Sequence, residues 1–271
     1  MDENTKGKAT IGLSLSLTKA CFGEFMTHEQ VAVQTRDGEC RVHVISPSDG
    51  GPWPAVIFYA DAGGIRPAMV EMTQCLADAG YIVLLPDLFY RYGPYGPLVP
   101  KEVFKGDVGA ILGPLMATTG NAKAAADTEA FLDYLDTRAD VAGGKVGAVG
   151  FCMGGGMAIA SAATYPDHFA AVASFHGGNL ATSAPDSPHL LAPKLKAEVY
   201  VAGADNDGSY PPAMAERLEA ALTKAGVRHF AEIYPGAAHG WMVPDFPVYD
   251  QMSAARGWKS LLALFNRNLR G

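Results

Sequence analysis

Short apolar runs alternate with helix-like segments along most of this chain, from Trp53 to the C-terminus. Each run is long enough for one buried strand, and the segment that follows it can return along the sheet as a helix. The alternation predicts a largely parallel sheet with helices on both faces. No internal repeat, low-complexity tract or linker interrupts it, which predicts one domain. The runs interpreted as strands are residues 54–60, 81–87, 145–151, 170–177, 197–203 and 229–236.

The segment before Trp53 has a different pattern. Residues 27–47 contain two stretches of period-2 alternation around an "RDG" turn, which predicts a β-hairpin. Residues 1–25 lack the sustained apolar core and the cleavage site of a signal peptide, because serine and threonine interrupt their apolar residues. We expect residues 26–271 to form a single domain and residues 1–25 to be a mostly disordered extension.

Charge and hydropathy argue against several classes of partner. The 271 residues carry a formal net charge of −7 at pH 7, which gives no basic surface for nucleic acid. No apolar run reaches the roughly 18 residues of a membrane-spanning helix. The four cysteines form no CxxC pair and no zinc-binding spacing with histidine. This favours free thiols in a cytoplasmic protein, and we expect no metal and no organic cofactor.

The stretch "VGAVGFCMGGGM" places Cys152 between Gly150 and Gly154, at the end of one predicted strand. This G-x-Cys-x-G pattern is typical of a nucleophile elbow, the strained strand-to-helix turn of the α/β-hydrolase fold. Side chains two residues before and after the nucleophile would collide with the adjoining strand and helix, which explains the glycines. The turn would place the thiol at a helix N-terminus, with the N–H of Met153 directed at a developing oxyanion.

The glycines have a simpler interpretation, in which they only allow a helix and a strand to pack closely and Cys152 is a buried bystander. A dinucleotide-binding turn is disfavoured because Gly150, Gly154 and Gly155 do not match the G-x-G-x-x-G spacing. A thiol redox centre is disfavoured because Cys152 has no second cysteine at CxxC spacing. We therefore favour the nucleophile.

In this fold the nucleophile is followed along the chain first by an acid and then by a histidine. His239 follows the last predicted strand and precedes the last predicted helix, so it is the candidate base. Asp205 and Asp207 both follow an earlier strand. Asp207 is favoured because a helix that begins with proline starts soon after it, and Asp205 stays the alternative. His176 lies at the end of its own strand and could line the pocket.

Residues 88–120 form a long connection rich in glycine, proline and tyrosine. Connections of this length are uncommon in compact domains unless they have a function. We interpret this one as a candidate lid or pocket wall.

Three segments, "GFCMGGGMA", "VAGADNDGSYPP" and "YPGAAHGW", together resemble the dienelactone hydrolase family, a cysteine branch of the α/β-hydrolase fold. The resemblance covers the chain from about Thr27 to the C-terminus. It implies that an ester or lactone is hydrolysed through an acyl-enzyme, with Cys152, His239 and Asp207 as the triad. By the same resemblance, the N–H of Ala62 is the second oxyanion donor.

The chain also departs from the family. Where the family has a glutamate that contacts the resting thiol, this chain has Asp61, which is one methylene shorter. The family's arginine shortly after the histidine is missing, and Trp241 lies in that neighbourhood. Arg66 and Arg91, on loops expected to face the pocket, are candidates to replace its charge. Tyr90 and Trp241 could line a pocket for a bulkier or less charged substrate, and each of these side chains could instead be structural.

The expected function is hydrolysis of a small-molecule ester or lactone by a monomer or homodimer. An acyltransferase with the same triad is an alternative, because the sequence does not show whether water reaches the acyl-enzyme. A catalytically silent binding protein of the same fold is the other alternative.

Overall fold

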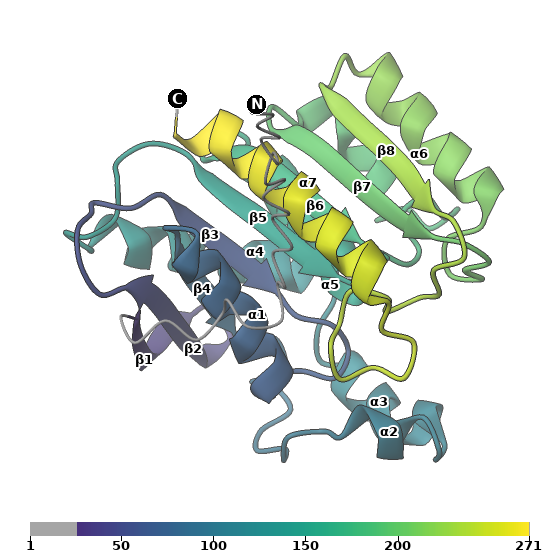
Figure 1. Cartoon of the computed structure of the whole chain (residues 1–271), viewed down its shortest axis with the longest axis horizontal. Coiled ribbons are helices and arrows are strands. Elements are labelled where there is room, and N and C mark those ends of the chain that lie inside the picture. Colours follow the sequence, from purple (N-terminus) through teal and green to yellow (C-terminus); the bar gives the residue numbers. More distant parts are fainter. Residues whose placement is uncertain (1–25, 271) are drawn as a thin grey trace, which may run out of the picture.

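The computed structural model describes residues 26–270, so the expectation for residues 1–25 lies outside the described part of the chain. One sheet runs through the molecule, as the arrows in Figure 1 show. Its strands are β1 (Met26–Thr35), β2 (Gly38–Pro47), β3 (Ala55–Tyr59), β4 (Ile82–Pro86), β5 (Val146–Phe151), β6 (Phe169–Phe175), β7 (Glu198–Ala204) and β8 (His229–Tyr234).

The spatial order of the strands is β1-β2-β4-β3-β5-β6-β7-β8. The hairpin of β1 and β2 is antiparallel, with Thr35 opposite Gly38 at its turn, and β2 pairs with β4 in the antiparallel sense. The remaining pairs, from β4 through β8, are parallel. The predicted largely parallel sheet and its N-terminal hairpin are therefore confirmed. Because the parallel strands share a direction, the loops after β3, β5, β7 and β8 meet at one edge of the sheet.

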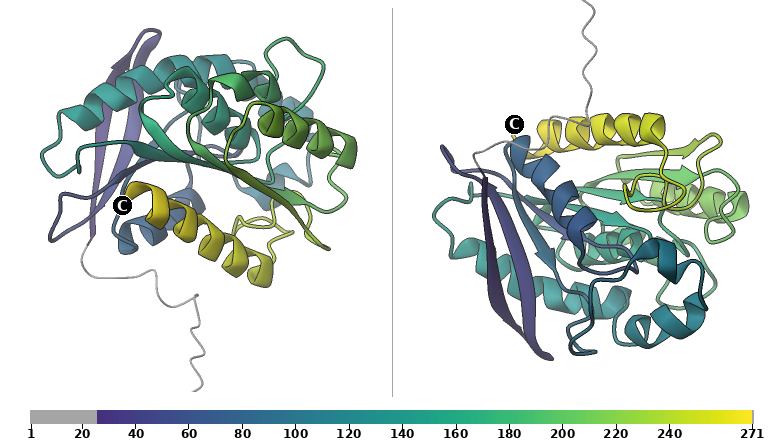
Figure 2. Two further views of the ribbon diagram at one scale, coloured as in Figure 1. Left: turned by 90° about the horizontal axis from the view of Figure 1, so that it is seen from above. Right: turned by 60° about the horizontal axis from the view of Figure 1, so that its bottom comes forward.

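Helices cover both faces of the sheet, as the left view in Figure 2 shows. An apolar core lies on each face of the sheet. Successive residues of β3 pack into the two cores in turn, because successive side chains of a strand point to opposite faces. Ile57 packs in the core under α4, α5 and α6, and Phe58 packs in the core under α1 and α7. The helices are α1 (Pro67–Asp78), α4 (Asn121–Asp136), α5 (Met153–Thr164), α6 (Pro212–Lys224) and α7 (Gln251–Leu269), with a 3₁₀ helix at Pro188–Lys194.

Local sequence explains where these helices start. Pro67 and Pro212 occupy the first turns of α1 and α6, where a missing N–H costs nothing. Asp250 caps α7 by accepting a hydrogen bond from the N–H of Ser253 at 2.7 Å. These signals place the helix starts, and the apolar faces then pack on the sheet.

The long connection after β4 contains two short helices, α2 (Pro100–Val103) and α3 (Val108–Met116), and we call residues 100–116 the cap segment. Asp107 caps α3 by accepting from the N–H of Ala110 at 3.0 Å. Phe104 meets the ring of Phe246 edge-on, with ring centroids 5.2 Å apart. Phe246 belongs to the loop between β8 and α7, so the cap segment lies against that loop (Figure 1).

Candidate active site

Cys152 is the single residue between β5 and α5, and its backbone has φ 54° and ψ −118°. A positive φ is uncommon for a residue with a side chain and marks stored strain. The turn is held in place on both sides. The N–H of Cys152 donates to the carbonyl oxygen of Phe175 at 3.1 Å, and a Cβ built on Gly154 would lie 2.2 Å from the carbonyl oxygen of Tyr59. Glycine is therefore required where α5 begins against the end of β3.

Three side chains from three strand ends form one hydrogen-bonded chain. The Nε2 atom of His239 lies 3.1 Å from Sγ of Cys152. The Nδ1 atom of His239 lies 2.6 Å from Oδ2 of Asp207. Cys152 follows β5, Asp207 follows β7 and His239 follows β8, so residues far apart in the sequence meet at the same edge of the sheet. The thiol and the imidazole are both partly exposed, whereas Asp207 is buried.

Asp205, the alternative acid, has a different partner. Its Oδ2 atom accepts a hydrogen bond from the N–H of Gly236 at 3.0 Å, and its own N–H donates to the carbonyl oxygen of Ala237 at 2.8 Å. Asp205 thereby joins the loop after β7 to the loop after β8, which leads to His239. Only Asp207 of the two aspartates bonds to the imidazole in the described structure.

Ser209 is a further member of this site that the sequence reasoning missed. Its hydroxyl donates to Oδ1 of Asp207 at 2.6 Å, and its N–H donates to the same oxygen at 2.8 Å. The hydroxyl also lies 3.2 Å from Nδ1 of His239. A serine two residues after an aspartate is a common turn arrangement, so the "DGS" segment contained a usable signal.

Burial and hydrogen bonds act in opposite directions on the pKa values of His239 and Asp207. Burial disfavours a charged His239, but its hydrogen bonds to Asp207 and Cys152 outweigh that cost and raise its pKa to about 10. Burial likewise disfavours a charged Asp207, but hydrogen bonds from His239 and Ser209 lower its pKa to about 2. The site therefore favours a protonated imidazole next to an ionised carboxylate.

His176, which follows β6, packs against His239 from within the protein. Its ring centroid lies 5.4 Å from that of His239 and 6.0 Å from that of Trp241. It is fully buried, and neither of its ring nitrogens has a hydrogen-bond partner among the described residues. Burial first, and the nearby charge of His239 second, hold the pKa of His176 well below its ordinary value. His176 is therefore an uncharged side chain that packs against the ring of His239.

Two backbone N–H groups lie on neighbouring strand ends beside the elbow. Met153 is the first residue of α5, where an N–H has no partner within its helix. Ala62 follows β3, which is paired with β5. The next two N–H groups, of Gly63 and Gly64, are bound to Asp61 at 2.8 and 3.0 Å. Within residues 26–270, no hydrogen bond uses the N–H of Ala62 or of Met153.

Comparison with known proteins places this arrangement in a family. The model of the dienelactone hydrolase family matches residues 40–269, which is most of the chain. The chain belongs to the dienelactone hydrolase family. It is thus a hydrolase of the α/β-hydrolase fold, as the sequence motifs predicted.

Individual relatives of this dienelactone hydrolase family member agree with that assignment. A Synechocystis protein provisionally named carboxymethylenebutenolidase is 28% identical over 245 residues, which cover 89% of this chain and 96% of the relative. The carboxymethylenebutenolidase of Pseudomonas putida is 26% identical over 171 residues, or 63% of this chain and 70% of that protein. A crystal structure from Klebsiella pneumoniae, provisionally titled a dienelactone hydrolase, has the same fold, with a TM-score of 0.78 at 24% identity, and covers 89% of this chain and 98% of its own.

Asp61, the residue in place of the family glutamate, forms no hydrogen bond with the thiol among residues 26–270. Its two carboxylate oxygens accept from Nη1 and Nη2 of Arg66 at 2.7 and 2.9 Å, and one of them also accepts from the N–H of Gly63. Both side chains of the pair are almost fully buried. A bidentate ion pair thus holds the shorter side chain of Asp61 on its own loop.

Arg66 is likewise paired within the protein. Its Nε and Nη2 atoms donate to both oxygens of Asp245 at 2.7 and 3.0 Å, so two carboxylates hold one guanidinium. Arg66 also lies on the wall of a surface cavity of about 460 Å³. None of the Cys152, Asp207 and His239 side chains lines that cavity. Its lining residues are His43, Ile65, Arg66, Pro67, Val70, Glu71 and Gln74.

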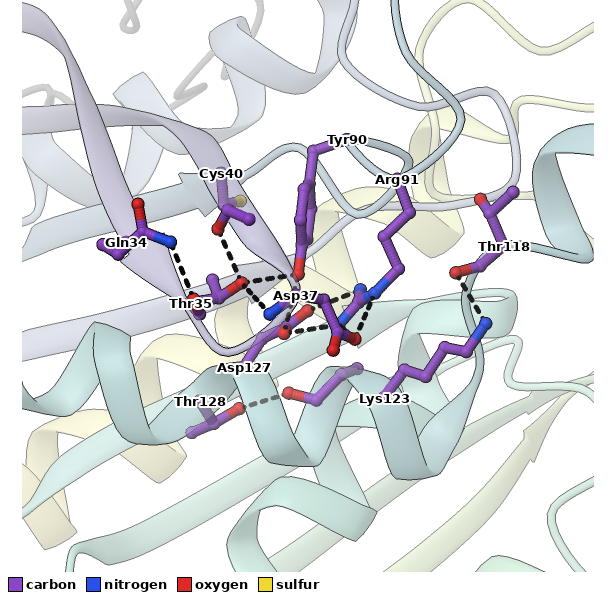
Figure 3. Close-up of polar contacts among 12 residues, drawn as sticks. Gln34, Thr35, Asp37, Cys40, Tyr90, Arg91, Thr118, Lys123, Asp127 and Thr128 are labelled. Carbon is purple, nitrogen blue, oxygen red and sulfur yellow. Dashed lines mark hydrogen bonds and ion pairs between the residues drawn. The ribbon is translucent and has the colours of Figure 1, made fainter.

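Tyr90 and Arg91 belong to a polar network on the β1–β2 side of the sheet, drawn in Figure 3. The hydroxyl of Tyr90 is 2.7 Å from Oγ1 of Thr35 and donates to Asp127 at 3.0 Å. Arg91 donates to Asp127 at 2.7 and 2.9 Å and to Asp37 at 2.7 Å. The two residues tie the loop after β4 to the hairpin turn and to α4, so the expectation that they line the substrate pocket is not supported.

Trp241 is fully buried, so it does not line an open pocket either. Its ring stacks on Tyr234 with centroids 4.2 Å apart and meets Phe175 edge-on at 5.9 Å. It fills the core under α7, where a Cβ on Gly257 would lie 2.9 Å from it. Trp241 therefore stabilises the loop that contains His239 by packing in the core.

The described cysteines differ from the sequence expectation at one position. Cys40 and Cys152 carry free thiols, whereas Cys75 is in a disulfide, so the expectation of free thiols is wrong for Cys75. Across residues 26–270 no three histidine, cysteine or acidic side chains are grouped as metal ligands would be. Over the same residues no helix has the length and hydropathy to span a membrane.

Proposed function

We propose that this protein hydrolyses a carboxylic ester or lactone through an acyl-enzyme on Cys152. The observation that carries the proposal is the hydrogen-bonded chain in which His239 lies 3.1 Å from the sulfur and 2.6 Å from Asp207. The strained turn presents the sulfur at the N-terminus of α5, where a helix stabilises negative charge. Family membership and relatives named carboxymethylenebutenolidase support the same reaction class.

Acylation starts from the Cys152 sulfur as a thiolate paired with the protonated His239, and forms a bond between sulfur and the carbonyl carbon. The electron pair of the carbonyl π bond moves to oxygen, where the N–H groups of Ala62 and Met153 stabilise it. Each such donor is worth about 3 kcal/mol in comparable sites. When the carbonyl re-forms, the C–O bond of the alcohol breaks and His239 returns its proton to that oxygen. In a lactone, the alcohol stays attached to the acyl group.

Deacylation repeats these steps with water. His239 takes a proton from water as its oxygen attacks the thioester carbonyl, and the C–S bond then breaks. The sulfur leaves as the thiolate, His239 keeps the proton that it took from water, and the carboxylic acid leaves. Asp207 keeps the imidazole in one orientation throughout, and Ser209 holds Asp207 through two hydrogen bonds to Oδ1.

The proposal is tested by measuring the intact mass of the protein after brief mixing with p-nitrophenyl acetate. We expect one acetyl adduct that maps to Cys152, disappears in Cys152→Ala and decays in water as p-nitrophenol release continues. Cys40→Ala is the matched control, because Cys40 is a free but fully buried thiol. Burial also raises the pKa of Cys40 well above its ordinary value.

Two other outcomes contradict hydrolysis. An adduct that persists in water and decays only after an alcohol or thiol is added would indicate an acyltransferase. No adduct and no p-nitrophenol from folded, reduced protein would indicate a binding protein of the same fold.

A further inference from the structure

We infer, on the basis of the proposed hydrolase function, that the substrate is an uncharged ester or lactone rather than one that carries a carboxylate. The amino-acid sequence suggested Arg66 and Arg91 as ligands for a substrate carboxylate. In the structure each of them is already paired with two aspartates. Neither arginine is therefore free to bind a substrate anion, and each of the two clusters has one more carboxylate than guanidinium.

Arg66 uses all its donor groups within the protein. Nη1 and Nη2 donate to Asp61, Nε and Nη2 donate to Asp245, and Nη1 also reaches the carbonyl oxygen of Gly64 at 3.2 Å. The ring of Phe246 covers the guanidinium plane, with its centroid 5.3 Å from Cζ. The side chain of Arg66 is 1% exposed and that of Asp61 is fully buried. Turning Arg66 toward a substrate would leave Asp61 buried without its partner, which is strongly unfavourable.

Arg91 is also held by two carboxylates, next to the turn of the β1–β2 hairpin (Figure 3). Nε donates to Asp37, and the two Nη atoms donate to the two oxygens of Asp127. The ring of Tyr90 lies 4.5 Å from the Arg91 Cζ atom and covers one face of the guanidinium. Asp127 is 3% exposed, so releasing Arg91 would also strand a buried carboxylate.

The charges in these two clusters do not cancel. Arg66 faces Asp61 and Asp245, and Arg91 faces Asp37 and Asp127, so each cluster has one more carboxylate than guanidinium. The cap segment adds no net charge, because its two lysines are matched by two acidic residues. Those residues are Lys101, Glu102, Lys105 and Asp107.

Asp245 carries the surplus charge of the Arg66 cluster on the loop between β8 and α7. It belongs to the loop that follows His239, its side chain is 31% exposed, and Arg66 joins it to the loop that carries Ala62. The family has an arginine shortly after the histidine, and this chain has Trp241 in that neighbourhood. Trp241 is uncharged and buried. An anionic substrate would meet a net repulsion here, whereas a neutral ester would not.

The test compares two esters of the same acyl length, p-nitrophenyl hexanoate and mono-p-nitrophenyl adipate. The adipate carries a terminal carboxylate too far from the ester to hydrolyse it rapidly by itself. We expect kcat/KM to be at least about tenfold higher for the hexanoate at low ionic strength, and the ratio to shrink as salt is added.

Asp245→Asn removes one carboxylate from Arg66 and leaves Asp61 as its partner. We expect this variant to raise kcat/KM for the adipate several-fold relative to the hexanoate. Asp167→Asn is the matched control, since it removes the same charge from an exposed ion pair with Lys196, before β6 and at the opposite edge of the sheet. The control should leave the ratio of the two esters unchanged.

The inference is overturned if the adipate is hydrolysed as well as the hexanoate, or better, while Cys152 is acylated normally. It is also overturned if Asp245→Asn and Asp167→Asn change the ester ratio equally. Loss of both reactions, with no acyl-Cys152, instead overturns the proposed hydrolase function and removes the basis of the inference.

Discussion

Gly150 and Gly154 face each other across the turn that carries Cys152, and a Cβ atom built on Gly150 would lie 1.9 Å from the carbonyl oxygen of Gly154. That distance is far inside van der Waals contact, and the obstacle is backbone that cannot rotate away. The elbow therefore has no room for a side chain at either position. The two glycines allow β5 to enter α5 with only one residue between them.

Gly150→Ala is therefore expected to destabilise the protein by about 3 kcal/mol or more, because the added methyl group must displace the first turn of α5. Urea unfolding followed by circular dichroism measures the change. Gly143→Ala is the control, since nothing lies within 4 Å of a Cβ at that position. The control should change stability by less than about 0.5 kcal/mol. Equal stabilities of the two variants would contradict the steric account.

Asp207→Asn is expected to lower kcat/KM for an ester by about 10²- to 10⁴-fold, because the imidazole loses the carboxylate that orients it and stabilises its charge. Asp205→Asn is the matched control, since Asp205 bonds to Gly236 rather than to His239. Its loss should cost much less. Steady-state kinetics on both variants decide the assignment, and a larger defect in Asp205→Asn would reverse it.

Stability should depend on pH through His239. The pKa of His239 rises from 6.5 to about 10 on folding, so the folded protein binds this proton more tightly than the unfolded chain does. The resulting stabilisation is complete below about pH 6.5 and is lost as the pH rises toward 10. The free energy of unfolding of the native protein should thus decline toward that of His239→Ala between these values.

Urea unfolding at several pH values between 6 and 10 tests this expectation. His168→Ala serves as the control, because His168 is exposed and lies at the opposite edge of the sheet, before β6. A gap between the native protein and His239→Ala that stays constant over the range would show that His239 gains no proton affinity on folding.

The ion pair of Arg66 and Asp61 can be tested by a double-mutant cycle. Arg66→Met should cost about 3–5 kcal/mol, because it leaves a fully buried carboxylate without its partner. Adding Asp61→Asn should recover part of that loss, since the stranded charge is removed. In the exposed pair of Lys196 and Asp167, the same kind of cycle should give a much smaller coupling energy, because solvent screens the two charges. Additive effects of Arg66→Met and Asp61→Asn would contradict the pairing.

Much of the fold followed from the sequence, because the signals are local. A buried parallel strand needs an unbroken apolar run, and a strained turn at Cys152 needs glycine on both sides, so both requirements are visible as residue patterns. The order of nucleophile, acid and histidine along the chain is a topological property, and it indicated His239 and the pair of Asp205 and Asp207, of which the proline-started helix favoured Asp207.

Tertiary structure decided what the remaining polar side chains do. Arg66 and Arg91 were both interpreted as candidate substrate ligands, because a loop arginine has the same sequence appearance whether it is free or paired. Their partners Asp245 and Asp127 lie 179 and 36 residues away along the chain. Pairing over such separations depends on how loops meet in space, and no local pattern encodes it.

Packing decided the rest of the site for the same reason. Trp241 and His176 follow strand ends, where a side chain can face either solvent or the core, and both are fully buried here. The sequence by itself thus determined the sheet, the elbow and the order of the reacting groups, since each depends on neighbouring residues. Only the tertiary structure decided which charges are already neutralised, because ion pairing depends on distances between segments that the chain order leaves open.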